Sequence, residues 1–131
     1  MTFVRVLIDT HALLWWLSDD AALTRPARKI MAETKNVVFV SAASAWEIAT
    51  KVRLGKLSTA AELAADFAGY LDREGFQILA ISGEHAIRAG LLPGAHKDPF
   101  DRMLVAQAQA ESMPIVSNEA IFDTYGVRRL W

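Results

Sequence analysis

The sequence predicts an α/β fold in a single domain, residues 1–131, with a central parallel sheet of four to five strands and helices on both faces. Three observations lead to this prediction. The length is typical of one domain. Short apolar runs alternate with segments of helical periodicity, which is typical of a parallel sheet covered on both sides. No internal repeat, low-complexity tract or long Pro/Gly/Ser linker divides the chain.

Five short apolar runs rich in β-branched residues predict the strands. They are residues 3–8, 36–40, 77–81, 114–116 and, with a weaker pattern, 127–130. The segments between them have helical periodicity. They are residues 11–17, 25–34, 42–53, 60–73, 83–89 and 98–111.

Residues that favour helix starts support three of these helices. Ser41 and Ser82 are capping residues directly before two of the segments, and Asp98-Pro99 places a proline at a first helical position. In an open α/β sheet, ligands bind outside the carboxyl ends of the strands. The residues that follow the strands are therefore the first candidates for a functional site.

The composition restricts the chemistry of such a site. The chain has no cysteine, so a disulfide framework and a thiolate metal site are both excluded. A divalent metal must then be held by carboxylates, histidines or water. Those ligands favour Mg²⁺ or Mn²⁺.

The net charge of −1 gives no signature of nucleic-acid binding for the chain as a whole. A local basic rim is one interpretation of the Lys and Arg residues, and scattered solvated side chains are the other. Hydrophobic residues make up 53% of the chain, so we expect some apolar surface to be kept for a partner protein. Charged residues interrupt every apolar run of membrane length, and the first nine residues carry no leader pattern. We therefore expect a cytoplasmic protein without membrane contact.

Two acidic residues lie where a parallel sheet would bring them together. Asp9 directly follows the first apolar run, at the expected carboxyl end of a strand. Taken alone, it is explained equally well as a helix N-cap. Glu47 lies inside the helix expected after the second strand, between apolar neighbours. A carboxylate in such surroundings needs a cation or hydrogen-bond donors.

Further acids open the helix expected at residues 98–111 and follow the fourth strand. Asp98 and Asp101 are three positions apart and therefore share one face of the first turn. Capping by Asp98, and placement of Asp101 near the positive end of the helix dipole, would explain both without a function. Glu119 follows the fourth strand in a polar loop that starts with Ser117.

Acidic groups crowded on one rim have no stabilising role without a cation, because like charges a few ångström apart cost on the order of several kcal/mol. A hard divalent metal explains them together. The predicted ligands are Asp9, Glu47, Asp101 and Glu119.

Four stretches of the chain resemble motifs of the PIN-domain endoribonucleases, and more narrowly of the VapC-type toxins of VapBC toxin–antitoxin pairs. They are residues 6–17 (VLIDTHALLWWL), 41–51 (SAASAWEIATK), 98–107 (DPFDRMLVAQ) and 115–119 (IVSNE), with Tyr125-Gly126 behind the last. They follow the family's order from end to end of the chain. The resemblance implies a PIN-like three-layer α/β/α fold.

Carried over by position, the family's acids fall on Asp9, Glu47 and Asp101. Asp98 is an additional acid, and the fourth family position, usually Asp, is Glu119 here. The resemblance implies cleavage of RNA phosphodiester bonds with Mg²⁺ or Mn²⁺ as cofactor. It also implies a cognate antitoxin protein as partner, in a homodimer or a higher toxin–antitoxin assembly.

Three more residues are candidates to support this chemistry. Thr10 and Ser117 would orient water or phosphate, and Arg102 would contact backbone phosphates. Ordinary capping or surface contacts explain these three residues as well. Asp98 has the same two interpretations, as a cap and as a support for the metal site.

Other classes of protein share single features of this pattern. A haloacid-dehalogenase phosphatase needs a second acid two residues after the first, where this chain has His11. A response-regulator-like domain needs paired early acids, a strand-terminal phosphoacceptor and a downstream lysine, which fit poorly. A catalytically inactive PIN-fold module that binds RNA or protein is the remaining alternative. Retention of Asp9, Glu47 and Asp101 argues against it, and Glu119 in place of Asp keeps it open.

Overall fold

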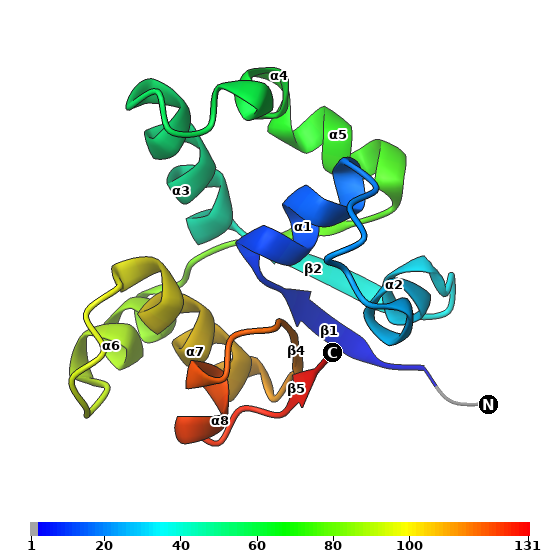
Figure 1. Ribbon diagram of the computed structural model, residues 1–131. Coiled ribbons are helices and arrows are strands. Elements are labelled where there is room, and N and C mark those ends of the chain that lie inside the picture. Colours follow the sequence, from blue (N-terminus) through cyan, green and yellow to red (C-terminus); the bar gives the residue numbers. More distant parts are fainter. Residues whose placement is uncertain (1–2) are drawn as a thin grey trace.

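The computed structural model describes residues 3–131 and contains a five-stranded sheet in which every pairing is parallel (Figure 1). The strand order is β3-β2-β1-β4-β5. This confirms the predicted α/β fold with a central parallel sheet. The strands are β1 (Arg5–Ile8), β2 (Val37–Ser41), β3 (Gln77–Leu79), β4 (Ile115–Val116) and β5 (Arg129–Leu130).

Helices connect the strands and cover the sheet on both faces (Figure 1). Within residues 3–131, none of them is both long enough and apolar enough to cross a membrane. The helical elements are α1 (Thr10–Leu17), α2 (Arg25–Ala32), α3 (Ala42–Arg53), the 3₁₀ turn η1 (Ser58–Ala60), α4 (Ala61–Ala65), α5 (Phe67–Glu74), α6 (Gly83–Leu91), α7 (Pro99–Glu111) and α8 (Ile121–Thr124).

Strand β1 divides its side chains between two hydrophobic cores. Val6 and Ile8 join a cluster with residues of α1 to α5, whereas Leu7 joins a second cluster with Leu104 of α7 and Phe122 of α8. The three strand side chains are fully buried. Because successive side chains of a strand point to opposite faces, this alternation produces one helical layer on each side of the sheet. The fold therefore has three layers.

The single helix expected at residues 60–73 is a wrong prediction. The chain forms two helices, α4 and α5, which are separated at Asp66 (φ −142°, ψ 54°). The Asp66 carboxylate lies over the first turn of α5, in the space that a Cβ atom at Gly69 would occupy. An acidic group is stabilised at a helix N-terminus, so Asp66 starts α5 and does not continue α4.

Candidate active site

Two polar residues follow neighbouring strands and meet at the carboxyl edge of the sheet. Asp9 follows β1 and caps α1, where its Oδ1 accepts a hydrogen bond from the peptide N–H of Ala12 at 2.8 Å. Ser117 follows β4, and its hydroxyl donates to Oδ2 of Asp9 at 2.5 Å. Both residues are buried. The N-cap interpretation of Asp9 is therefore correct, and the same carboxylate also faces the other acids described below.

Glu47 reaches this edge from α3 and is buried. The hydroxyl of Thr10 donates to its Oε1 at 2.7 Å and lies 3.0 Å from the hydroxyl of Ser44. Lys51, one helical turn after Glu47, donates to Oε2 at 2.7 Å. These donors meet the requirement of a carboxylate that is placed among apolar neighbours.

The N-terminal turn of α7 contributes two acids. Oδ1 of Asp98 accepts hydrogen bonds from the peptide N–H groups of Phe100 at 2.9 Å and Asp101 at 3.1 Å. The capping role expected for Asp98 is therefore confirmed. Oδ2 of Asp101 lies 2.9 Å from Nε2 of His96, in the loop that precedes the helix.

Glu119 comes from the loop after β4. Its peptide N–H donates to the hydroxyl oxygen of Ser117 at 2.9 Å. Its carboxylate is half-exposed, and Oε1 lies 4.0 Å from Nδ1 of His11. Ser117 therefore contacts both Asp9 and the backbone that carries Glu119.

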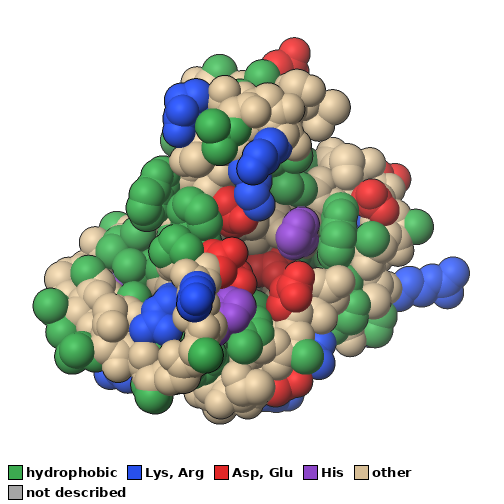
Figure 2. All heavy atoms as spheres, turned by 60° about the vertical axis from the view of Figure 1, so that its left-hand side comes forward, with side chains coloured by type: hydrophobic (Ala, Val, Ile, Leu, Met, Phe, Trp, Pro, Cys, Tyr) green, Lys and Arg blue, Asp and Glu red, His purple; other side chains and the backbone are tan. Residues whose placement is uncertain are grey.

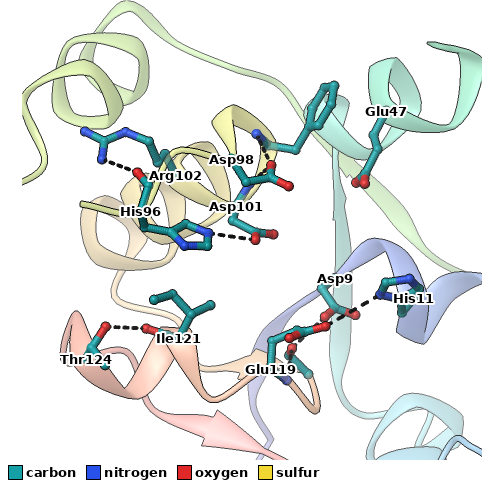
Figure 3. A network of polar contacts seen from close by, with 12 residues as sticks. Asp9, His11, Glu47, His96, Asp98, Asp101, Arg102, Glu119, Ile121 and Thr124 are labelled. Atoms are coloured by element: carbon teal, nitrogen blue, oxygen red, sulfur yellow. Dashed lines mark hydrogen bonds and ion pairs between the residues drawn. The ribbon is translucent and has the colours of Figure 1, made fainter. Parts of the chain in front are cut away.

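All four predicted ligands line one small pocket of about 150 Å³. Figure 3 shows these acids pointing toward one another: Asp9 and Glu119 from the segments after β1 and β4, Glu47 from α3, and Asp98 and Asp101 from the start of α7. In the space-filling view the acidic side chains gather in a hollow with histidines beside it (Figure 2). The lining is Asp9, Thr10, His11, Glu47, Lys51, Asp98, Asp101, Leu104 and Glu119.

Acidic side chains outnumber basic ones in this pocket, and the pKa values of two of the acids are raised, mainly by burial. Burial raises the pKa of Asp9 from about 3.8 to about 6, and Glu119 adds to the rise, against the lowering effect of Ser117, Ala12 and His11. Burial also raises the pKa of the Asp101 carboxyl, which the hydrogen bond from His96 opposes. A bound cation would stabilise the ionised form of both groups.

The donor set of the pocket fits a hard divalent cation, because it consists of carboxylate oxygens. Across residues 3–131, no three Asp, Glu or His side chains are already arranged as a metal site. Asp9, Glu47 and Asp101 each contact a donor of their own, as Glu47 contacts Lys51. Each ionised carboxylate keeps further lone pairs for a cation, and ligation would require these side chains, which already face one another, to move closer together.

The supporting residues divide into two groups. Thr10 lines the pocket and donates to Glu47, whereas Ser117 is outside the lining and donates to Asp9. Arg102 does not support the expected phosphate contact, because its guanidinium donates to backbone carbonyl groups. It holds the loop before α7.

Sequence reasoning missed two basic partners of the acids. Lys51 lies four residues after Glu47 on the same helix, so the usual pairing of side chains one turn apart would have identified it. His96 lies in a loop five residues before Asp101. No periodicity applies to a loop, so the sequence carried no signal for this contact.

A three-layer α/β fold with a carboxylate-lined pocket at the carboxyl edge of its parallel sheet defines a class of proteins suited to divalent-metal chemistry. Within that class, comparison with known protein families assigns the chain to one family. Residues 6–127 match the PIN domain, and this chain belongs to the PIN domain family. Proteins of this family are nucleases, and such nucleases generally use divalent metals.

Several solved structures share the fold at low sequence identity. VapBC2 from Rickettsia felis, bound to a DNA fragment from its promoter, has a TM-score of 0.71 and 16% identity, with 98% of this chain and 100% of that chain covered. FitAcB from Neisseria gonorrhoeae has a TM-score of 0.64 and 18% identity, with 95% of each chain covered. A toxin–antitoxin complex from Klebsiella pneumoniae has a TM-score of 0.54 and 18% identity, with 88% and 87% covered. No curated protein sequence matches this chain.

Proposed function

We propose that this protein is a Mg²⁺- or Mn²⁺-dependent endoribonuclease that acts as the toxin of a type II toxin–antitoxin pair in the cytoplasm. The observation that carries the proposal is the pocket in which Asp9, Glu47, Asp101 and Glu119 converge with too little positive charge to neutralise them. Membership of the PIN domain family, whose proteins are nucleases, supports it.

The proposed roles follow from the contacts of each residue. Asp9, Glu47 and Asp101 hold the cation, and the more exposed Glu119 completes its ligands directly or through water. The bound ion would lower the pKa of an attacking water and stabilise the charge on the departing 3′ oxygen. Ser117 and Thr10 keep the Asp9 and Glu47 carboxylates oriented before substrate arrives.

Cleavage of an RNA pool by the pure protein tests the reaction. We expect cleavage with Mg²⁺ or Mn²⁺, none after EDTA is added, and none with Asp9→Asn. Asp72→Asn is the matched control, because Asp72 is an exposed acid on α5. Cleavage that persists in EDTA or in Asp9→Asn would show that the proposed mechanism is wrong.

The proposed antitoxin partner has a docking place that is continuous with the pocket. A groove of about 730 Å³ runs along α1 and η1–α4 and shares Thr10, His11 and Lys51 with the pocket lining. Its other walls are largely apolar, with Leu14 and Leu63 among them. A segment with apolar side chains and a basic end fits this surface, because its charge would complement the carboxylates. The Klebsiella pneumoniae toxin–antitoxin complex, which has this fold, supports such a partner.

Expression in bacteria tests the toxin role. We expect the chain expressed alone to arrest growth, the Asp9→Asn variant to permit it, and a small co-encoded protein to relieve the arrest. Normal growth during accumulation of well-folded wild-type protein would contradict the toxin role. That result would not bear on RNA cleavage, which the experiment with the RNA pool tests separately.

A second copy of this chain is the other proposed partner. Ile87 and Leu91 of α6 are 66% and 78% exposed. Glu84 and Arg88 on α6 have opposite charges, so a twofold contact would bring each Glu84 toward Arg88 of the partner subunit. Buried apolar side chains with complementary charges are the features of a homodimer interface.

A further inference from the structure

The loop between α6 and α7, residues 92–98, leads into the helix start that carries Asp98 and Asp101, and it is held by Arg102. One guanidinium nitrogen of Arg102 donates to the carbonyl oxygen of His96 at 3.0 Å. The second terminal nitrogen, Nη2, donates to the carbonyl oxygens of Ala89 at 3.0 Å and Leu92 at 2.7 Å. The Arg102 side chain therefore provides hydrogen bonds to carbonyl groups at the end of α6 that lack helical partners. It also connects this helix end to the backbone of His96.

A second contact holds the same loop from the side of α8. The hydroxyl of Tyr125 donates to the carbonyl oxygen of Pro93 at 3.0 Å. The next residue, Gly94, has φ +93°, and a Cβ atom at that position would lie 3.0 Å from the Tyr125 hydroxyl oxygen. The loop is thus held at both ends of the stretch from Pro93 to His96.

His96 uses this fixed backbone to contact the pocket. Its Nε2 lies 2.9 Å from Oδ2 of Asp101, and both side chains are about three-quarters buried (25% and 28% exposed). An ionised carboxylate only accepts hydrogen bonds, so the imidazole is the donor. Figure 3 shows the imidazole on the side of Asp101 away from Glu47.

Asp101 needs such a donor because burial and the neighbouring acids both disfavour its ionised form. Asp98 and Glu47 both act on the Asp101 carboxylate, and both disfavour its ionised form. Among residues 3–131, His96 provides the one side-chain hydrogen bond to this carboxylate. Without that bond, repulsion would favour rotation of Asp101 away from the other acids.

We propose that His96 is a positioning residue, which holds one oxygen of Asp101 so that the other remains available to a divalent cation, and that Arg102 acts through His96 by fixing the loop. The inference rests on the proposed function, because it takes Asp101 as a metal ligand. Hydrogen-bond partners of ligating carboxylates commonly change metal affinity by about 10- to 100-fold when they are removed.

Mn²⁺ binding to the purified full chain, measured by calorimetry, tests the role of His96. His96→Leu keeps an apolar body without a donor, whereas His96→Gln places an amide N–H near the position of Nε2. We expect His96→Leu to weaken Mn²⁺ binding about 10-fold or more, and His96→Gln to recover most of the loss. Melting temperatures in EDTA should be similar for both variants, which separates positioning from a general loss of stability.

Other outcomes would overturn the inference in distinguishable ways. If the wild type binds Mn²⁺ and His96→Leu binds it equally well, the role of His96 is wrong while the metal site stands. If the wild type binds no Mn²⁺, the proposed function falls and the role of His96 with it. Detection of an imidazole nitrogen bonded to Mn²⁺ by pulsed electron paramagnetic resonance, in a signal that is lost in His96→Leu, would make His96 a ligand and overturn its positioning role.

A double-mutant cycle tests the action of Arg102 through His96. Lysine cannot present two nitrogens to separate carbonyl groups, so we expect Arg102→Lys to weaken Mn²⁺ binding. The double variant His96→Leu/Arg102→Lys should bind Mn²⁺ no more weakly than His96→Leu alone. Additive losses would overturn this coupling. Arg128→Lys, at an exposed position, is the matched control and should leave binding unchanged.

Discussion

The hydroxyl of Ser117 donates to the Asp9 carboxylate, and this buried hydrogen bond joins two residues that are 108 positions apart in the chain. The contact links the ends of β1 and β4, which are neighbours in the sheet. It also acts against the burial that raises the pKa of Asp9 to about 6. The charge state of Asp9 and the geometry of the sheet edge are therefore coupled.

Ser117→Ala removes this donor. We expect a loss of about 2 kcal/mol in the free energy of unfolding at pH 7.5, because a buried ionised carboxylate loses a charge-assisted hydrogen bond. At pH 4.5 the loss should be smaller, since Asp9 is then protonated in the folded protein. Urea unfolding at both pH values measures the difference, with the exposed Ser58→Ala as control. Equal losses at the two pH values would contradict the prediction.

Asp9→Asn should stabilise the metal-free protein at neutral pH. The pKa of Asp9 is about 3.8 in an ordinary environment and about 6 in the folded protein, so between these values the folded state binds more protons than the unfolded state. The contribution of protonated Asp9 to the free energy of unfolding is fully present below pH 4. It is lost as the pH rises through 6, and the total loss is about 3 kcal/mol. Asparagine cannot ionise and avoids this loss.

The advantage of Asp9→Asn over wild type should therefore be small near pH 4 and reach its full value above pH 7. Unfolding in urea with EDTA, at a series of pH values, measures this difference. Comparing the two proteins at each pH cancels the titration of groups that they share. A variant that is less stable than wild type above pH 7 would identify Asp9 as a structural cap whose charge is needed.

Mn²⁺ should raise the melting temperature of the wild type, because it binds the folded site and not the unfolded chain. At a concentration 100-fold above its dissociation constant, the gain is about 2.7 kcal/mol, or roughly 10 °C for a domain of this size. Asp101→Asn should remove most of the gain, and Asp72→Asn should keep it. Lowering the pH through 6 should also reduce the gain, since Asp9 then becomes protonated. Equal shifts in Asp101→Asn and wild type would exclude Asp101 as a ligand.

Leu91→Glu should convert a dimer to a monomer. Leu91 is 78% exposed on the apolar surface of α6, and a charge there would be buried without a partner in a twofold contact. Sedimentation velocity measures the change. Leu54→Glu is the control, because Leu54 is also exposed (51%) but lies at the end of α3. A wild-type protein that sediments as a monomer at high concentration would contradict the proposed homodimer.

Local sequence patterns were sufficient to predict the elements that set the sheet. The apolar runs and the cap at Ser41 determine β1, β2 and α3, and α3 has the predicted bounds. Convergence of the acids could also be predicted, because carboxyl ends of neighbouring parallel strands meet at one edge. The break between α4 and α5 at Asp66 could not be predicted. The helical periodicity of the sequence continues through this position, and the break depends on the Asp66 carboxylate lying over Gly69.

The sequence by itself therefore determined the layers of the fold and the edge at which the acids lie, because strand and helix periodicities are local properties of the chain. Only the tertiary structure decided which side-chain donors Asp9 and Asp101 meet. Ser117 reaches Asp9 because β4 pairs with β1, and His96 reaches Asp101 because Arg102 holds its loop against the end of α6. Such contacts depend on how separate elements are placed relative to one another, and residue spacing does not encode that placement.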